Sequence, residues 1–336
     1  MKVKDQVLSA LEQNRGTYIS GEALAKALSV SRNAVWKSIR QLQESGHDIK
    51  AVPNRGYLLS QENNVLSPQS IMQYLKIDGL SPEVYPELNS TSAFLKQRAE
   101  EGAGEGTVII AESQTAGKGR HGRSFYSPPG GGIYMSVLLR PQFTAQDSLC
   151  ITTCAAVAVC KAIEKHTGVE SQIKWVNDVF CHGKKVCGIG TEAALDLESG
   201  GLHYAILGIG LNVFPSKEPI PTELQDIIGT ILDRPIPGQD LRSQLLADIL
   251  NFFFEEYPNL TEKAYFAAYR SRSMVLGRPI YILKNGTQEE AVALDLEPDF
   301  QLRVQRADGT IDSLSSGEVS VRLQTKAAAM ESETSE

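Results

Sequence analysis

The sequence predicts a multidomain α+β protein, because three residue patterns follow one another along its 336 residues. Residues 1–62 combine short helix-like runs with a hairpin, which is typical of a winged helix-turn-helix. Residues 63–274 mix strand-like and helix-like runs, which indicates a mixed sheet with helices packed on it. Residues 275–324 hold short strand-like runs between turn pairs and predict a small antiparallel β-barrel. Residues 325–336 have no apolar pattern, so we expect a disordered tail.

The head is expected to contain three short helices. Ser20 can cap the second helix and Ser31 the third. Only the turn Ser29-Val30 separates these two helices, as in a helix-turn-helix. The expected apolar faces, at helical spacing, are Val7, Leu8 and Leu11 in the first helix, Leu24, Ala27 and Leu28 in the second, and Val35, Ile39 and Leu42 in the third.

Positive charge is concentrated in this head. Residues 1–60 carry nine Lys and Arg against five Asp and Glu, whereas the whole chain has a net charge of −7. A basic head on an acidic body favours DNA as its partner, and the hairpin after the third helix is typical of a wing. A helical packing module with solvated charges is the alternative. The residues expected to contact DNA are Ser31, Arg32, Asn33, Lys37, Arg40 and, at the tip of the wing, Arg55.

The central region is expected to be of catalytic size. The polar stretch 61–68 predicts a linker to the head. A long loop at 214–229, rich in Pro and Gly, could order over a ligand. The strand-like runs are 107–111, 133–139, 172–176 and 204–213, and the helix-like runs are 92–100, 146–166, 241–257 and 262–271.

The eight residues from Ala116 to Arg123 form a glycine-basic loop, with three glycines and three Lys or Arg side chains. Glycines let backbone N–H groups approach an anion, and the cations add fixed charge for phosphate or carboxylate oxygens. A dinucleotide-binding turn would open a helix, but a strand-like run follows here, and the P-loop sequence is missing. The alternative is a solvated basic loop with no ligand.

A second cluster of polar side chains follows a strand-like run. Lys174-Trp175-Val176-Asn177-Asp178 places a lysine, an amide and a carboxylate together, and Lys185 comes after a turn-prone His-Gly pair. Taken alone, this cluster fits a surface hairpin with a solvated tip better than it fits a site.

Together with Lys185-Val-Cys-Gly-Ile189 and Gly208-Ile-Gly-Leu-Asn212, these motifs resemble those of biotin protein ligases. With the winged head, nearly the whole chain resembles the bifunctional type that also represses the biotin operon. The resemblance implies a class II synthetase-like core and an SH3-like carboxy-terminal barrel. It also implies two-step chemistry with ATP and Mg²⁺: biotin and ATP give biotinyl-5′-AMP, and a lysine of a carboxylase carrier domain then takes the biotinyl group.

The resemblance also assigns roles to residues, with Lys185 and Arg120 as the catalytic pair. Asp178 is expected on the magnesium side of the site. The partners implied are a biotin carboxyl carrier protein, operator DNA and, when adenylate is bound, a second copy of the chain. Biotin is expected at Ser90, Thr91, Ser92, Gln114, Lys118, Gly119, Arg120 and Lys185, and ATP and adenylate at Gly117, Arg123, Asn177, Asp178 and Asn212.

Two residues depart from the family pattern: Lys118 stands where Arg is usual, and Phe125 where Trp is usual. Neither change removes the residues that carry the chemistry. A lipoate or octanoate ligase, a catalytically inactive biotin-sensing repressor, and a ligase with a vestigial head are the competing interpretations.

The remaining sequence features favour the cytoplasm. The five cysteines form no Cys-x-x-Cys pair and are odd in number, so neither a disulfide framework nor a zinc site is expected. No apolar stretch is long enough to span a bilayer, and the first residues have no apolar signal core. We therefore expect a cytoplasmic protein with no membrane partner.

Overall fold

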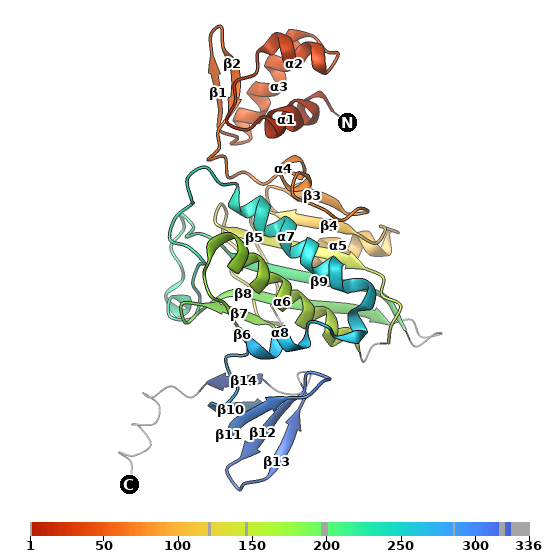
Figure 1. Cartoon of the computed structure of the whole chain (residues 1–336), viewed down its shortest axis with the longest axis vertical. Helices are drawn as coiled ribbons and strands as arrows, with labels where there is room; N and C mark the ends of the chain where they lie inside the picture. Colours follow the sequence, from red (N-terminus) through yellow and green to blue (C-terminus); the bar gives the residue numbers. More distant parts are fainter. Residues whose placement is uncertain are drawn as a thin grey trace.

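The computed structural model describes residues 2–119, 122–144, 147–195, 201–284, 286–315 and 320–323. A head, a central sheet with helices and a carboxy-terminal sheet follow one another along its long axis (Figure 1). This order confirms the predicted α+β class. The domain boundaries stay predictions, and the tail expected at 325–336 lies outside the described residues. No helix in the described part of the chain is long and apolar enough to cross a membrane.

The head consists of three helices and a hairpin. Its elements are α1 (Val3–Gln13), α2 (Gly21–Ala27), α3 (Arg32–Glu44), β1 (Ile49–Val52) and β2 (Gly56–Leu59). Ser20 Oγ accepts a hydrogen bond from Ala23 N (3.0 Å), and Ser31 Oγ accepts one from Ala34 N (3.1 Å). Both serines therefore cap the helices that the sequence assigned to them.

One small core holds the three helices of the head together. It contains the predicted apolar residues Val7, Leu8, Leu11, Leu24, Val35, Ile39 and Leu42. Ala27 was wrongly predicted to join this core, because α2 ends at Ala27 and the alanine is exposed. Ala25 is buried in its place, since the face of this short helix passes through Leu24, Ala25 and Leu28.

The central sheet has seven strands of mixed direction. Their order is β3 (Ser81–Tyr85), β4 (Thr107–Ala111), β5 (Gly132–Leu139), β9 (Leu202–Asn212), β8 (Lys184–Leu195), β7 (Asp178–Cys181) and β6 (Gln172–Lys174). The pair β3–β4 is parallel, and the other neighbouring pairs are antiparallel. β3, β7 and β8 were not predicted from the sequence. The strand predicted at 172–176 is also too long, because the chain turns after Lys174.

Helices cover the two faces of this sheet unequally. α6 (Ser148–Thr167), α7 (Leu241–Glu256) and α8 (Phe266–Ser271) share a large core with one face, as Figure 1 shows. On the other face, α5 (Thr91–Glu100) packs Leu95 and Ala99 against strand residues such as Leu138 and Ile206. The helix predicted at 262–271 is split: Lys263 has a φ of +57° and separates a short 3₁₀ helix (Tyr257–Glu262) from α8. The short α4 (Pro68–Met72) was not predicted.

The carboxy-terminal part is an antiparallel sheet. β10 (Pro279–Lys284), β11 (Thr287–Leu296), β12 (Leu302–Arg306), β13 (Ile311–Leu314) and β14 (Ser320–Leu323) pair in the order β13-β12-β11-β10-β14. A bulge between Ala293 and Asp295 interrupts the register of β11 and bends it. The described strands leave β13 and β14 at the two edges, so closure into an SH3-like barrel stays a prediction.

A buried ionic cluster joins the head to the core. Arg15, just beyond α1, donates to Glu12 Oε2 and to Asp240 Oδ2, both at 2.8 Å. Asp240 immediately precedes α7, so this guanidinium connects the first helix of the head to a helix of the core. Burial raises the pKa of the Glu12 and Asp240 carboxyls, and the positive charge of Arg15 partly offsets this effect.

A second arginine fixes the linker to the core. Arg242, in the first turn of α7, is 1% exposed. Its guanidinium donates to Glu112 Oε2 (2.7 Å), Gly132 O (2.9 Å) and Asn64 O (2.9 Å). These acceptors lie just after β4, at the start of β5 and in the linker, so one side chain connects three segments near the cavity described below.

His47 makes the stability of the head dependent on pH. Burial, reinforced by the positive charges of Lys4 and Arg15 and opposed by Glu112, lowers the pKa of His47 to about 4, from 6.5. Because the unfolded chain binds a proton more readily, the histidine costs stability as the pH falls below about 6.5. We expect wild type to lose roughly 2 kcal/mol between about pH 7 and pH 5 relative to His47→Gln.

Chemical denaturation of both proteins at the two pH values measures this difference. Comparison with His47→Gln is needed because Glu12 and Asp240, whose pKa values are raised, change stability in the opposite direction as the pH falls. Equal pH dependence in the two proteins would contradict the assignment.

Candidate active site

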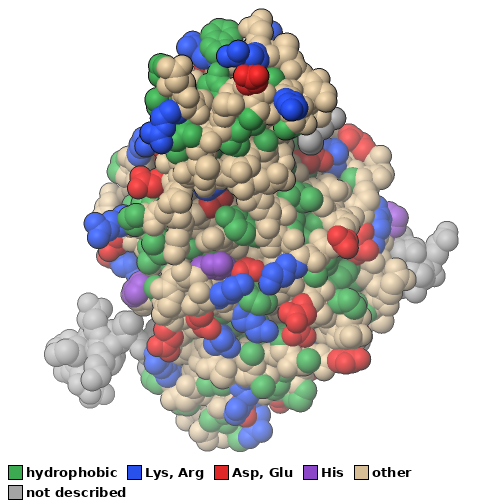
Figure 2. All heavy atoms as spheres, turned by 45° about the horizontal axis from the view of Figure 1, so that its top comes forward, with side chains coloured by type: hydrophobic (Ala, Val, Ile, Leu, Met, Phe, Trp, Pro, Cys, Tyr) green, Lys and Arg blue, Asp and Glu red, His purple; other side chains and the backbone are tan. Residues whose placement is uncertain are grey.

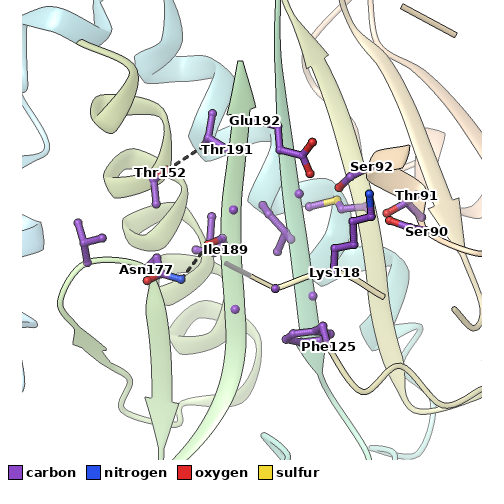
Figure 3. A pocket seen from close by; sticks show the side chains of 18 of the residues that line it. Ser90, Thr91, Ser92, Lys118, Phe125, Thr152, Asn177, Ile189, Thr191 and Glu192 are labelled. Carbon is purple, nitrogen blue, oxygen red and sulfur yellow. Dashed lines mark hydrogen bonds between the residues drawn. The ribbon is translucent and has the colours of Figure 1, made fainter. Parts of the chain in front are cut away.

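A cavity of about 470 Å³ lies against the central sheet, beside the first turn of α5 (Figure 3). Its wall is formed by α5, the glycine-basic loop, the turn before β7, the start of α6, and strands β5, β8 and β9. The predicted site residues that line it are Ser90, Thr91, Ser92, Gln114, Lys118, Gly119, Asn177 and Lys185. Residues far apart in the sequence therefore meet at one hollow, as the resemblance implied.

Four glycines form one wall of the cavity, which we call the glycine floor: Gly188 and Gly190 on β8, and Gly208 and Gly210 on β9. The strands pair Gly188 with Gly210 and Gly190 with Gly208, so the four form a square. Successive strand residues point to opposite faces, so the isoleucines between them, Ile189 and Ile209, pack into the core beneath α6. The Gly-Ile-Gly pattern thus gives a filled core on one face and bare backbone on the other.

Phe125 covers one edge of the glycine floor. A Cβ at Gly210 would overlap the Phe125 ring, and a Cβ at Gly188 would lie 2.9 Å from Phe125 Cε2. Side chains are therefore excluded from these two positions as long as the aromatic ring is there. A Cβ at Gly208 would lie 2.8 Å from Ser92 Oγ, so this corner is covered by the start of α5.

One end of the cavity is a network of neutral hydrogen-bonding groups. Gln114 Oε1 accepts from Thr91 N (2.9 Å), and Gln114 Nε2 donates to Ser127 Oγ (2.9 Å). The buried Ser136 hydroxyl on β5 is 2.8 Å from Thr91 Oγ1 and 3.0 Å from Ser92 Oγ. Ser90 caps α5 through Ala93 N. The groups of this network carry no formal charge, which suits an amide-like or urea-like group, and the charged side chains Lys118 and Glu192 also line the cavity.

The glycine-basic loop folds back on itself beside this network. Phe125 N donates to Gly117 O (2.8 Å), and Gly119 N donates to Arg123 O (2.6 Å). A Cβ at Gly117 would overlap the carbonyl oxygen of Phe125, so this close approach requires glycine. Lys118 and Gly119 reach the cavity wall, whereas Gly117 and Arg123 shape the loop. Arg120, the other predicted catalytic residue, lies outside the described residues.

Lys185 provides positive charge at the other side of the cavity. Its Nζ atom is 2.7 Å from Asp178 Oδ1, and Asn177 Nδ2 donates to the same oxygen (3.0 Å). Asn177 is in turn fixed to β8, because its Nδ2 donates to Ile189 O (2.9 Å). The lysine, amide and carboxylate that the sequence singled out are therefore in direct contact. Asn212 lies at the end of β9, two residues after Gly210 of the floor.

Trp175, the aromatic residue of the same motif, has a structural place. It is buried, and its Nε1 donates to Phe300 O (2.9 Å) in the turn between β11 and β12 of the carboxy-terminal part. The Tyr269 hydroxyl of α8 donates to Val176 O (3.0 Å). The turn that presents Asn177 and Asp178 is thus held from behind by the core and by the last part of the chain.

The long loop 214–229 is attached to the strand that carries Lys185. Lys185 N donates to Ile227 O (3.0 Å), and Gly229 N donates to Lys185 O (2.9 Å). Beside them, Lys184 Nζ donates to Gln225 O (2.8 Å). The loop predicted to order over a ligand therefore shares two backbone hydrogen bonds with the predicted catalytic residue.

The cysteines supply no reactive thiol to this cavity. All five are buried and free. Burial raises the pKa of the Cys187 thiol, which follows Lys185 on β8, well above its usual range. Since the thiolate is the reactive form, covalent catalysis through this cysteine is disfavoured.

The predicted DNA-contacting residues of the head are exposed on α3 and at the wing. Lys and Arg side chains gather at the end of the head in Figure 2. Arg32, Asn33, Lys37 and Arg40 are exposed on α3, and Arg55 at the wing stacks over the Tyr18 ring, 4.3 Å from its centroid. Trp36, which is 54% exposed on α3 beside Arg40, was not predicted from the sequence.

Other cavity residues were also missed. Glu192, which lines the cavity, and Ser136, which hydrogen-bonds to residues of its wall, gave no signal, because their role depends on which face of a strand they occupy. Gly190 did have a signal in the sequence, because the alternation of glycine with Ile189 could have indicated a strand face without side chains.

Comparison with known proteins agrees with this geometry. The model of the biotin/lipoate A/B protein ligase family matches residues 84–212, which include most of the cavity, and a helix-turn-helix (HTH) domain model matches residues 3–58. The bifunctional ligase/repressor BirA of Bacillus subtilis (strain 168) is 35% identical over 257 residues, covering 76% of this chain and 78% of that protein.

Two further relatives extend the likeness. The bifunctional ligase/repressor BirA of Escherichia coli (strain K12) is 28% identical over 315 residues, covering 93% of this chain and 95% of that protein. The structure of the biotin protein ligase from Aquifex aeolicus in complex with biotin and ATP is 27% identical and superposes with a TM-score of 0.59, covering 73% of this chain and 99% of that chain. The chain therefore belongs to the biotin/lipoate A/B protein ligase family, in the branch that carries an amino-terminal helix-turn-helix domain.

Proposed function

We propose that this protein activates biotin with ATP, transfers it to a lysine of a carboxylase carrier domain, and represses transcription in response to biotin. The observation that supports the ligase activity is the difference in chemistry between the two ends of the cavity. Neutral groups around Thr91 and Gln114 form one end, and Lys185 provides charge at the other, with the glycine floor between them. Biotin has a neutral ureido ring at one end and a carboxylate at the other, so it matches both.

The side chains then divide the work by their chemistry. Ser90, Thr91, Ser92 and Gln114 bind the ureido ring, and Lys118 and Gly119 of the glycine-basic loop close over it. Lys185 and Arg120 stabilise negative charge where the carboxylate meets the α-phosphate. Gly117, Arg123, Asn177, Asp178 and Asn212 belong to the nucleotide side of the site.

The reaction proceeds in two transfers. A biotin carboxylate oxygen bonds to the α-phosphorus of ATP as the bond to the β-phosphate oxygen breaks, which gives biotinyl-5′-AMP and pyrophosphate. The ε-amine of the carrier lysine then attacks the anhydride carbonyl, loses a proton and releases AMP. Lys185 contributes most where charge develops, because a cation already in place needs no reorganisation.

The residues present fit a magnesium ion that is held mainly by the nucleotide. The described residues contain no group of three or more Asp, Glu, His or Cys that could bind a metal by themselves. Mg²⁺ usually takes one or two carboxylates together with substrate phosphates and water, and Asp178 can supply such a carboxylate. The ion would neutralise phosphate charge there.

The test is pyrophosphate–ATP exchange by the purified chain with biotin, lipoate, octanoate or no acid. We expect exchange with biotin and none with the other acids, because the hydrogen-bonding end of the cavity would be left unpaired by an apolar chain. Exchange with lipoate instead would move the protein to the neighbouring activity. Failure with every acid would indicate a sensor without catalysis.

The head gives the protein its second role, operator binding. In the proposal, biotinyl-5′-AMP orders the loops around the cavity and favours a dimer, which spaces two heads for a palindromic operator. The exposed basic face of α3 and the contact between Arg15 and Asp240 support a head that both meets DNA and is fixed to the core. The five free cysteines support a reducing compartment, the cytoplasm.

A double variant, Lys37→Ala with Arg40→Ala, should bind DNA from upstream of the biotin synthesis genes at least about 100-fold more weakly, because phosphate and base contacts are both lost. Gel-shift titration with and without biotin and ATP measures the loss. Exchange activity should be unchanged, and Lys26→Ala on the exposed side of α2 is the matched control. If the wild type bound the DNA with the same affinity with and without biotin and ATP, the proposed regulation by biotin would be contradicted.

A further inference from the structure

The glycine floor has one corner that the described side chains leave bare. Phe125 lies over Gly188 and Gly210, and Ser92 lies over Gly208, at the distances given above. For Gly190, no atom of the described residues comes within 4 Å of where a Cβ would stand. Gly190 also lines the cavity, so this corner opens into the space where the acid binds.

The position of Gly190 along β8 tells which part of the acid it faces. Lys185 Nζ lies 3.3 Å from the Cβ position of Gly188, so the carboxylate end of the acid belongs beside Lys185, at the Gly188 end of the floor. Gly190 is about 7 Å farther along the strand. The five-carbon chain of biotin spans a similar length, so the sulfur-containing ring lies over Gly190 and the ureido group reaches Thr91 and Gln114.

We propose that Gly190 determines specificity by leaving room beneath this ring, so that the protein activates biotin-type acids that carry an additional group on the floor side of the ring. The inference rests on the proposed ligase function. Biotin sulfone is the simplest member of this class. Its two sulfone oxygens project from opposite faces of the ring, so one of them must enter the floor.

A side chain at position 190 removes that room without disturbing the fold. The φ of Gly190 is outside the left-handed region, and a Cβ there meets no described atom, so alanine is accommodated in the strand. Alanine would occupy the space that the sulfone oxygen needs, whereas unmodified biotin has no atom in that position.

The experiment is pyrophosphate–ATP exchange with biotin and with biotin sulfone, in wild type, Gly190→Ala and Gly104→Ala. Gly104 is the matched control, because its Cβ position is equally bare among the described residues and lies in an exposed loop outside the cavity. We expect wild type to use both acids. In Gly190→Ala, kcat/KM should fall at least tenfold for the sulfone and less than threefold for biotin, and Gly104→Ala should match wild type.

Each other outcome has a distinct meaning. Exchange with biotin but none with the sulfone in wild type overturns the inference and leaves the proposed function standing. An equal fall in kcat/KM for both acids in Gly190→Ala, or no fall for either, also overturns the inference, because position 190 would then not distinguish the ring substituent. Lack of exchange with biotin in wild type instead contradicts the proposed function. Isothermal titration of biotin sulfone against Gly190→Ala checks that the loss lies in binding.

Discussion

Lys185→Ala should reduce biotin-dependent pyrophosphate exchange by about 10²- to 10³-fold, the cost of removing one group aimed at developing charge. The ammonium group is 2.7 Å from Asp178 and adjacent to the glycine floor, so it lies where carboxylate and phosphate oxygens converge in the proposed reaction. The loss should appear in kcat more than in the KM for biotin, because the charge that it stabilises is greatest in the transition state.

Two control variants make this test specific. Lys96→Ala removes an exposed lysine on α5 and should behave as wild type. Asp178→Asn keeps Lys185 but removes the carboxylate that holds it, so we expect a smaller loss with a changed dependence on Mg²⁺. Exchange in Lys185→Ala within threefold of wild type would refute the catalytic role of the lysine.

Arg242→Met should lower the free energy of unfolding by about 3–5 kcal/mol, since it leaves the Glu112 carboxylate and two carbonyl groups without their partner. The side chain is 1% exposed and connects the linker, the end of β4 and the start of β5. Methionine has a similar length, so the change removes the charge and the donors more than the volume.

Urea unfolding followed by tryptophan fluorescence measures the effect, because Trp175 is buried in the core. Arg234→Met, at an exposed position in the segment before α7, is the matched control and should change stability by less than about 0.5 kcal/mol. A loss below about 1 kcal/mol in Arg242→Met would show that the three segments hold together without this guanidinium.

The head could be predicted well from sequence because its signals are local. Ser20 and Ser31 cap helices within three residues of themselves, and Val35, Ile39 and Leu42 repeat at the spacing of one helix. The prediction that Ala27 is a core residue was wrong for an equally local reason. A helix of seven residues has too few turns for its periodicity to define the buried face.

The cavity likewise contains contacts that local sequence could predict and contacts that it could not. Lys185, Asp178 and Asn177 come from the hairpin of β7 and β8 and the turn before it, so their contact was within reach of a sequence argument. Ser136 contacts Thr91 only because β5 presents it on the face beside α5, and Arg242 meets Glu112 and Asn64 from a distant helix. Such contacts depend on strand register and helix packing, which no nearby residues encode.

Loop 214–229 is attached to β8 at Lys185, so the position of the loop and the alignment of this residue are linked. Both backbone groups of Lys185 are engaged by this loop, through Ile227 O and Gly229 N. Movement of the loop away from β8 would break both bonds at Lys185, so the position of the loop and the geometry of this side of the cavity are coupled. In the proposed reaction the two therefore act as an interlock: Lys185 is aligned for charge stabilisation only while the loop lies against β8.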